Sequence, residues 1–342
     1  MPKRPVIADL ARASGVSVAT VDRVLNRRLP VREDTAMRVA AAAERIGYHA
    51  SGLLKQRLRD TPARSFGFLL QKRSDEFYRA FAAELTGATK AASFIRGRAA
   101  VDFMDELVPS LIARHIAEMG ARVDALAVVA VDHPLVNEAV AAVARAGKPV
   151  FTLLSDVTAP ERAGYLSVDS RKAGRTAAWA IARLAKQPGK IGILLGSHRY
   201  LSQELAEMSF RSYMREHATE FTLLEPLVNL DDPRIAHEAA GHLIAGTPDL
   251  VGLYVAGGGA EGVLRALREE GAGARLVTVC NELMPATRAG LIDGTLDLVL
   301  ATPIAALAAR AVELMARACA GEALGASAQL QLPAEIYISE NI

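Results

Sequence analysis

Residues 6–26 are VIADLARASGVSVATVDRVLN, and this stretch decides the fold of the N-terminal part of the chain. Ile7 and Leu10 lie at the spacing that places side chains on one face of a helix. Gly15 favours the left-handed backbone conformation that ends a helix, and Ser17 is suited to cap the next one. These signals predict two short helices joined by a tight turn, which is the helix-turn-helix arrangement.

The second predicted helix has two different sides. Val21, Val24 and Leu25 form an apolar stripe that faces inward. A third helix is predicted over roughly 32–46, and Gly47 ends it. Three helices provide a core that can hold the second helix rigidly. The residues that then face outward are Ser17, Val18, Ala19, Asp22 and Arg23.

The charge is divided unevenly along the 342 residues. Residues 1–60 contain 12 Lys and Arg against 6 Asp and Glu, a balance of +6. The rest of the chain contains 28 basic and 32 acidic residues, a balance of −4. A basic segment joined to a mildly acidic one is typical of a protein with a polyanion-binding module.

The run IADLARASGVSVATVDRVLN, followed by VRED and by a helix that ends in AERIGY, resembles the LacI (lactose repressor) family of transcription regulators. The likeness covers residues 5–58. It implies a helix-turn-helix head over residues 1–58 that binds a double-stranded DNA operator. Residues 59–65 (RDTPARS) are then a hinge or linker, and residues 66–342 an effector-binding and dimerisation core.

The resemblance implies that Val18, Ala19 and Arg23 approach base edges. An arginine at this position can pair bidentately with a guanine, and small apolar side chains can contact the methyl group of thymine. Asp22 has two interpretations: it accepts a hydrogen bond from a cytosine amine, or it forms a salt bridge with a neighbouring arginine.

Other contacts are expected on the DNA backbone and in the minor groove. Ser17, Thr20 and Asn26 are placed for phosphate contacts, which position the protein without specifying sequence. Relatives follow the head with a hinge helix that inserts a leucine into the minor groove. Arg57 occupies the position where that leucine is expected, so Arg57 is the candidate for insertion.

From residue 65 onward, short apolar runs alternate with amphipathic ones, which predicts parallel sheets covered by helices on both faces. Strands are predicted at 66–70, 99–103, 125–131, 149–154, 191–195, 251–256, 276–280 and 296–300. Helices are predicted at 77–92, 134–146, 171–185, 203–218, 234–245 and 260–270.

The resemblance implies that these elements form two doubly wound lobes like those of type I periplasmic binding proteins, joined by three crossovers. The N-lobe would comprise about 66–168 plus 297–325, and the C-lobe about 169–296 plus 326–342. The two lobes would close on a small-molecule effector, usually a sugar or a sugar-like metabolite.

Polar and aromatic residues at the ends of the predicted strands are candidates for that effector site. They are Asp75, Phe77, Tyr78, Asp132, His133, Asp156, Asp169, Arg199, Tyr254, Asn281 and Glu282. Relatives commonly carry an arginine where this chain has Ala206. Arg199 or Glu204 is therefore expected to compensate.

A different function is suggested by Gly257, Gly259 and Gly262, which form GxGxxG after a predicted strand, with Glu282 about 20 residues further on. This alternative is an NAD-dependent Rossmann-type enzyme. The chain has no GxSxG nucleophile motif and no GxxxxGK[ST] phosphate loop. We therefore expect a regulator without catalytic residues or cofactors.

The remaining features fit a cytoplasmic protein. Cys280 and Cys319 are the only cysteines and form no CxxC pair, which argues against a disulfide framework and a zinc site. No apolar run reaches the roughly 18 residues needed to span a bilayer. We expect a repressor that acts as a homodimer, with a tetramer as the larger alternative.

Overall fold

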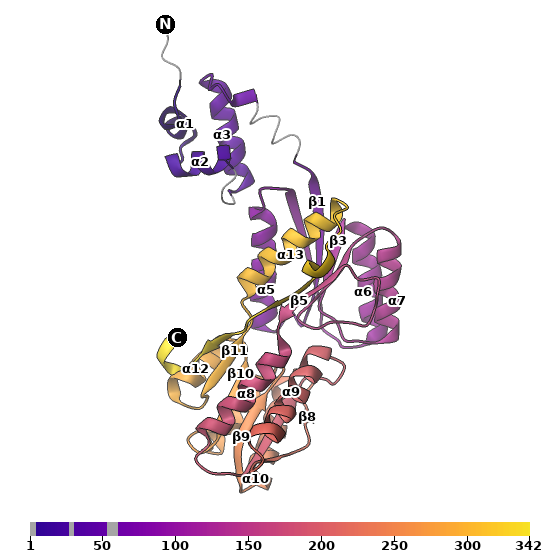
Figure 1. Ribbon diagram of the computed structural model, residues 1–342, viewed down its shortest axis with the longest axis vertical. Coiled ribbons are helices and arrows are strands. Elements are labelled where there is room, and N and C mark those ends of the chain that lie inside the picture. Colours follow the sequence, from indigo (N-terminus) through magenta and orange to yellow (C-terminus); the bar gives the residue numbers. More distant parts are fainter. Residues whose placement is uncertain (1–4, 27–30, 53–60) are drawn as a thin grey trace.

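The computed structural model describes residues 5–26, 31–52 and 61–342, which form a small helical head and an α/β body (Figure 1). The head contains α1 (Ile7–Ser14), α2 (Val18–Asn26) and α3 (Glu33–Arg45). Leu10, Val21 and Val39 are fully buried where these helices meet. The structure confirms the predicted all-helical head.

The turn between α1 and α2 has the predicted chemistry. Gly15 has a φ of +68°, in the left-handed region that favours glycine. The Ser17 hydroxyl oxygen accepts a hydrogen bond from the Thr20 backbone N–H at 3.1 Å, which caps α2. Arg45 Nη2 on α3 donates to the Ala13 carbonyl oxygen at 2.6 Å and so fixes the end of α1.

The N-lobe is a six-stranded sheet in the order β12-β5-β4-β3-β1-β2, and all of its neighbouring strands are parallel. Helices α5 and α13 cover one face, and α6 and α7 cover the other (Figure 1). The strands are β1 (Ala63–Gln71), β2 (Arg96–Met104), β3 (Ala125–Val128), β4 (Val150–Leu153), β5 (Gly164–Val168) and β12 (Gln329–Leu332). The helices are α5 (Glu76–Ala91), α6 (Pro109–Arg122), α7 (Pro134–Arg145) and α13 (Ile304–Cys319).

The C-lobe sheet has the order β13-β11-β10-β9-β6-β7, with β8 also paired to β6. Only the β11–β13 pair among these is antiparallel. Helices α8 and α9 cover one face, and α10, α11 and α12 the other. The strands are β6 (Lys190–Leu195), β7 (Thr222–Leu223), β8 (Leu227–Val228), β9 (Leu250–Val255), β10 (Val277–Asn281), β11 (Leu298–Ala301) and β13 (Glu335–Tyr337). The helices are α8 (Ser170–Leu184), α9 (Leu201–His217), α10 (Pro233–Gly246), α11 (Ala260–Glu269) and α12 (Pro285–Asp293), with 3-10 turns η1 (Gly325–Ala328) and η2 (Ser339–Asn341) elsewhere in the body.

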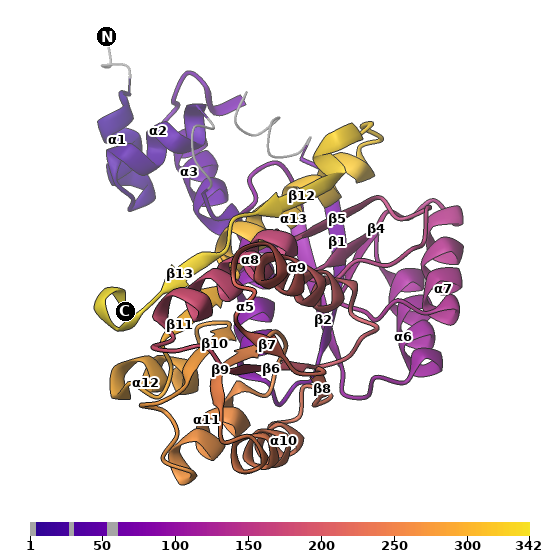
Figure 2. The ribbon, with the colours of Figure 1, turned by 60° about the horizontal axis from the view of Figure 1, so that its bottom comes forward.

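The chain passes between the lobes three times, between β5 and α8, between β11 and α13, and between β12 and β13 (Figure 2). The structure corrects two expected lobe boundaries. Strand β11 pairs with β10, so the segment from residue 297 begins in the C-lobe sheet. Strand β12 pairs with β5, so residues 329–332 belong to the N-lobe sheet. The sequence shows apolar runs but not which sheet each strand joins.

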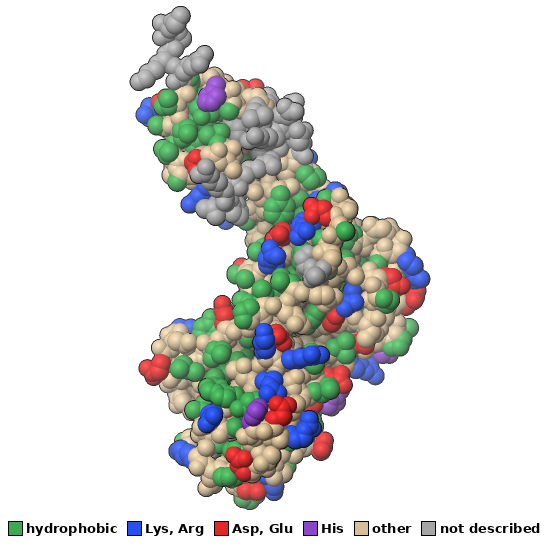
Figure 3. Space-filling view, viewed as in Figure 1, with side chains coloured by type: hydrophobic (Ala, Val, Ile, Leu, Met, Phe, Trp, Pro, Cys, Tyr) green, Lys and Arg blue, Asp and Glu red, His purple; other side chains and the backbone are tan. Residues whose placement is uncertain are grey.

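The linker expected over 59–65 ends earlier than predicted, because β1 begins at Ala63. Apart from these boundaries, the body has the predicted class: two doubly wound, mainly parallel sheets. Within the described ranges, no helix is both long enough and apolar enough to cross a membrane. On the face of the body visible in Figure 3, acidic and basic side chains are interspersed.

Candidate functional site

The outward side of α2 is a set of exposed side chains on a rigid support. Val18 is 52% exposed, and Ala19 and Arg23 are also exposed. Val21, on the opposite side of the helix, is fully buried in the core of the head. Because α1 and α3 both pack against the buried side, the Val18–Ala19–Arg23 side remains free of the head's own core.

The polar residues of α2 have local partners. The Ser17 and Thr20 hydroxyl oxygens lie 2.9 Å apart, and both belong to the cap described above. Asn26 Nδ2 donates to Asp22 Oδ1 at 2.6 Å, one helical turn away. Within the described residues Asp22 thus accepts from an amide, and both interpretations of Asp22 stay predictions because Arg27 and Arg28 lie outside the described residues. Arg57 lies outside the described residues.

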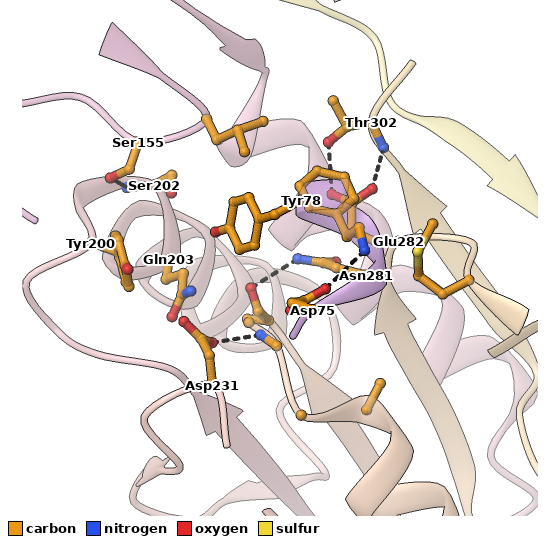
Figure 4. Close-up of a pocket in the computed structure, with 18 of the residues that line it drawn as sticks. Asp75, Tyr78, Ser155, Tyr200, Ser202, Gln203, Asp231, Asn281, Glu282 and Thr302 are labelled. Atoms are coloured by element: carbon orange, nitrogen blue, oxygen red, sulfur yellow. Dashed lines mark hydrogen bonds between the residues drawn. The ribbon is translucent and has the colours of Figure 1, made fainter. Parts of the chain in front are cut away.

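The body contains a cavity of about 510 Å³ at the carboxyl ends of strands from both lobes (Figure 4). This is the location at which doubly wound folds bind ligands. Five of the predicted effector residues line it: Asp75, Phe77, Tyr78, Asn281 and Glu282. The first three come from the start of α5 in the N-lobe, and the last two from the end of β10 in the C-lobe.

Seven predicted effector residues do not line the cavity, and most of them stabilise local structure. Asp132 accepts from the Thr158 backbone N–H at 2.8 Å. His133 Nδ1 accepts from the Leu135 backbone N–H at 3.2 Å and so caps α7. Asp156 forms a bidentate ion pair with Arg162, with both N–O distances at 2.6 Å.

Of the other four predicted effector residues, one caps a helix, one packs in a core and two lie on the surface. Asp169 caps α8 by accepting from the Lys172 backbone N–H at 3.1 Å. Tyr254 is fully buried in the C-lobe core, where its ring stacks on Phe210 at a centroid distance of 5.2 Å. Arg199 and Glu204 are exposed and do not line the cavity in this structure, so their compensating role stays a prediction. A residue at a strand end lies at the edge of the sheet where ligands bind. Helix capping and core packing then determine where its side chain points.

Several residues of the cavity wall were not predicted. They include Lys72, Ser155, Tyr200, Ser202, Gln203, Asp231 and Thr302. Lys72 directly follows β1 and Thr302 directly follows β11, so the strand-end rule could have found both. Asp231 follows the two-residue strand β8, which carries no recognisable pattern.

Carboxyl groups dominate the electrostatics of the cavity. Burial raises the pKa of Asp75, Asp231 and Glu261 and raises that of Glu282 to about 7. Glu282 is held by the second crossover, because its two carboxylate oxygens accept from the Thr302 N–H at 2.8 Å and the Thr302 hydroxyl at 2.7 Å.

The backbone is strained around the same cavity. Lys72, Leu154, Asp231 and Glu282 all have positive φ, between 25° and 66°, although none is glycine. All four line the cavity. Strained residues of this kind persist where the surrounding structure enforces them, and they concentrate at binding sites.

The glycine-rich loop before α11 makes a hydrogen bond and close packing contacts within the protein. The Gly258 backbone N–H donates to Asp231 Oδ1 at 2.6 Å, so a carboxylate already occupies the position of a bound anion. A Cβ on Gly262 would lie 1.8 Å from the Pro233 carbonyl oxygen, so this glycine permits close packing of α10 on α11. A pyrophosphate would also be repelled by the nearby carboxyl groups. The loop geometry therefore argues against the dinucleotide alternative.

Comparison with known proteins matches residues 6–51 to the model of bacterial regulatory proteins of the lacI family, and residues 66–323 to the periplasmic binding protein domain. Among curated relatives, HTH-type transcriptional regulator RegA of Clostridium saccharobutylicum is 40% identical over 72 residues, which is 21% of each chain. An uncharacterized HTH-type transcriptional regulator in the aml 5'region of Streptomyces limosus is 29% identical over 222 residues, which is 63% of this chain and 59% of that one. The chain thus spans between about a fifth and three fifths of the length of these relatives.

Solved structures resemble the body. GanP, a glucose-galactose binding protein from Geobacillus stearothermophilus, has a TM-score of 0.72 at 17% identity, covering 81% of this chain and 99% of that one. An ABC transporter solute binding protein from Burkholderia graminis, in complex with D-arabinose, has a TM-score of 0.74 at 18% identity, covering 82% and 97%. At these identities the likeness shows the fold alone. The model that matches the head describes bacterial regulatory proteins. The chain belongs to the periplasmic binding protein domain family over residues 66–323, and it joins this domain to a lacI-family helix-turn-helix domain at residues 6–51.

Proposed function

We propose that this chain is a sequence-specific DNA-binding repressor controlled by a small effector that binds between the lobes of its body. The observation that carries the proposal is the geometry of α2. Its Val18–Ala19–Arg23 side is exposed while Val21 anchors the helix in the head. A helix presented in this way fits the major groove of DNA.

The side chains of α2 divide into base and backbone contacts. Arg23 pairs with the N7 and O6 acceptors of a guanine, and Val18 and Ala19 contact a thymine methyl group. Ser17, Thr20 and Asn26 contact phosphates. The amide group of Asn26 has a second N–H available for a phosphate while its first stays on Asp22.

One head of this size covers too little DNA for useful specificity. We infer that the chain acts as a homodimer on two half-sites, with a tetramer as the larger alternative. We further infer that it acts in the cytoplasm, where the DNA is.

The effector is a sugar or a sugar-like metabolite. The rings of Phe77, Tyr78 and Tyr200 offer apolar faces, while amides and hydroxyls around them offer hydrogen bonds. Clefts that bind small polar ligands combine such groups. Solute binding proteins with the same fold have been solved with D-arabinose, D-fucose and D-allose bound.

The effector would act through the crossovers. Val168 and Ser170 flank the first crossover and Thr302 lies at the second, and all three line the cavity. Lys72 Nζ in the N-lobe donates to the carbonyl oxygens of Leu230 and Asp231 in the C-lobe, at 2.6 and 3.1 Å. A ligand that binds one lobe arrangement more tightly than another shifts their populations, and with them the placement of the two heads.

The proposal is tested by selecting duplexes from a random library with the intact chain at moderate salt. We expect enrichment of a motif made of two related half-sites, because each copy presents the same face of α2. If the chain binds duplexes in a salt-dependent way but enriches no sequence, the proposal is contradicted.

A further inference from the structure

The walls of the cavity are strongly acidic. The lining contains the carboxyl groups of five residues and, within the described chain, one cationic side chain, that of Lys72; the five are Asp75, Asp231, Asp232, Glu261 and Glu282. A ligand that enters this space therefore meets a predominantly negative environment, which attracts cations and repels carboxylates and phosphates.

The charge of the single ammonium group lowers the pKa of Asp75 and Asp231, but less than burial raises it, and the group forms no ion pair with either carboxyl in the described residues. Lys72 Nζ donates to the carbonyl oxygens of Leu230 and Asp231 at 2.6 and 3.1 Å, so it bridges the lobes. In the described part of the chain, no Lys, Arg or His nitrogen lies within 4 Å of a carboxylate oxygen of Asp75, Asp231 or Glu282. These three carboxyls form the acidic triad of the cavity.

The acidic triad is gathered from both lobes (Figure 4). Asp75 caps α5 in the N-lobe, Asp231 follows β8 and Glu282 follows β10 in the C-lobe. Burial is the main cause that raises the pKa of each, and the charge of Asp75 further raises the pKa of the other two. One ammonium group beside three partly buried carboxyls leaves negative charge that is not compensated, and a bound cation would offset it.

A second observation concerns a buried polar atom in the cavity wall that has no hydrogen-bond partner in the described residues. This atom is the hydroxyl oxygen of Tyr200. Tyr200 is only 3% exposed and lines the cavity. Buried polar atoms are rarely left unpaired in proteins, so the Tyr200 hydroxyl indicates a hydroxyl or amine group on a ligand.

The described residues do not form a metal site. No group of three or more His, Cys, Asp or Glu side chains is placed to hold a metal ion in the described ranges. The positive charge that the acidic triad needs must then be carried by an organic group that also makes hydrogen bonds.

We propose that the effector is a polyol that carries a protonated amine, of the chemical class of amino sugars and aminodeoxy alditols. Its ammonium group binds the acidic triad, and one of its hydroxyls binds Tyr200. The inference rests on the proposed function, in that the cavity is taken as the effector site. Sugar acids and sugar phosphates are excluded by repulsion from the same carboxylates.

The proposal is tested by calorimetry on the intact chain, without DNA, using matched sets of probes. Each set contains a neutral hexose or hexitol, its aminodeoxy counterpart, the N-acetylated form of that amine, and the corresponding sugar acid. We expect at least one amine to bind about 10-fold or more tightly than the other members of its set, since hydrogen bonds between charged partners are the stronger ones. The proposal is overturned if no amine outranks its neutral counterpart, including the case in which no amine binds.

Two isosteric variants separate the effect of a lost carboxylate charge in the cavity from the effect of a disturbed helix cap. Asp75→Asn removes a carboxylate of the triad but keeps the side-chain oxygen that caps α5. Asp169→Asn makes the same change at the cap of α8, outside the cavity. We expect Asp75→Asn to weaken amine binding by about 10-fold more than it weakens binding of the neutral member. We expect Asp169→Asn to change neither affinity. Equal loss for the amine and the neutral member in Asp75→Asn would contradict an ammonium contact.

The pH dependence gives an independent readout. The titratable groups that face Glu282 are Asp75 and Tyr78, both at the start of α5. With the pKa of Glu282 at about 7, its carboxyl loses a proton as the pH rises from 6 to 8. The ammonium group of a terminal aminodeoxy alditol stays charged over this range, so the profile is measured with that probe and not with a 2-amino sugar, whose neighbouring oxygens lower the pKa of the amine. Amine affinity should therefore rise by up to about 10-fold across it, and a flat or falling profile would contradict the proposal. None of these readouts depends on DNA, so failure of sequence-specific DNA binding would be seen separately.

Discussion

Arg23→Ala is expected to weaken binding to the selected duplex by about 5-fold to 150-fold for each half-site, which is 1–3 kcal/mol of lost base discrimination. Arg23 is exposed on α2 beside Val18 and Ala19, the face that enters the major groove in the proposed mode. The loss should be concentrated at one guanine. Fluorescence anisotropy with the selected duplex, and with that guanine replaced, measures both quantities.

Arg23→Lys is the matched control for this prediction. It keeps the positive charge but cannot reproduce the planar bidentate pair of a guanidinium with guanine. We therefore expect Arg23→Lys to lose the preference for guanine as well. If instead both variants lowered the affinity for all duplexes equally and reduced the salt dependence, Arg23 would be a phosphate contact and the base-reading assignment would be wrong.

Gly262→Val is expected to reduce the free energy of unfolding by about 3 kcal/mol or more, because overpacking against backbone cannot be relieved by a side-chain rotation. A Cβ at this position would lie 1.8 Å from the Pro233 carbonyl oxygen and 2.9 Å from the His237 backbone nitrogen. Helix α10 would have to move away from α11. Urea unfolding followed by circular dichroism measures the change.

Gly241→Ala, on α10 itself, is the control. A Cβ there has no atom within 4 Å, so the variant should be neutral or up to about 1 kcal/mol more stable through helix propensity. A fully stable Gly262→Val protein with altered dinucleotide binding would favour the enzyme alternative that the glycine pattern first suggested.

The head could be predicted from the sequence because each of its features is local. Gly15 at a positive φ, Ser17 as a cap and Val21 in the core are determined by residues within one or two helical turns. A helix-turn-helix therefore carries its signal in a short stretch, which both propensity and spacing record.

The body was predictable in class but not in all of its connections. The sequence pattern missed β5, since GYLSV mixes apolar and polar residues, and it could not assign β11 or β12 to a sheet. Strand pairing is a long-range property that apolar runs do not encode.

The residues that line the cavity could be predicted only in part, because their placement also depends on contacts between distant parts of the sequence. Asp75 and Glu282 lie at strand ends and line the cavity as expected, whereas Asp156 also follows a strand but is held by Arg162. Asp231 was missed because it follows a strand of two residues. Which strand-end side chains face the opposite lobe depends on caps, ion pairs and the lobe arrangement, which are all set in three dimensions.

The most direct test of the account is the affinity of the intact chain for its selected duplex, measured with and without a saturating concentration of the tightest-binding probe. We expect the affinity for the duplex to change by about 5-fold to 150-fold, and the affinity for the probe to change equally when the duplex is bound, because coupling between two sites is reciprocal. An unchanged affinity for the duplex, from a protein whose cavity is occupied, would contradict the account.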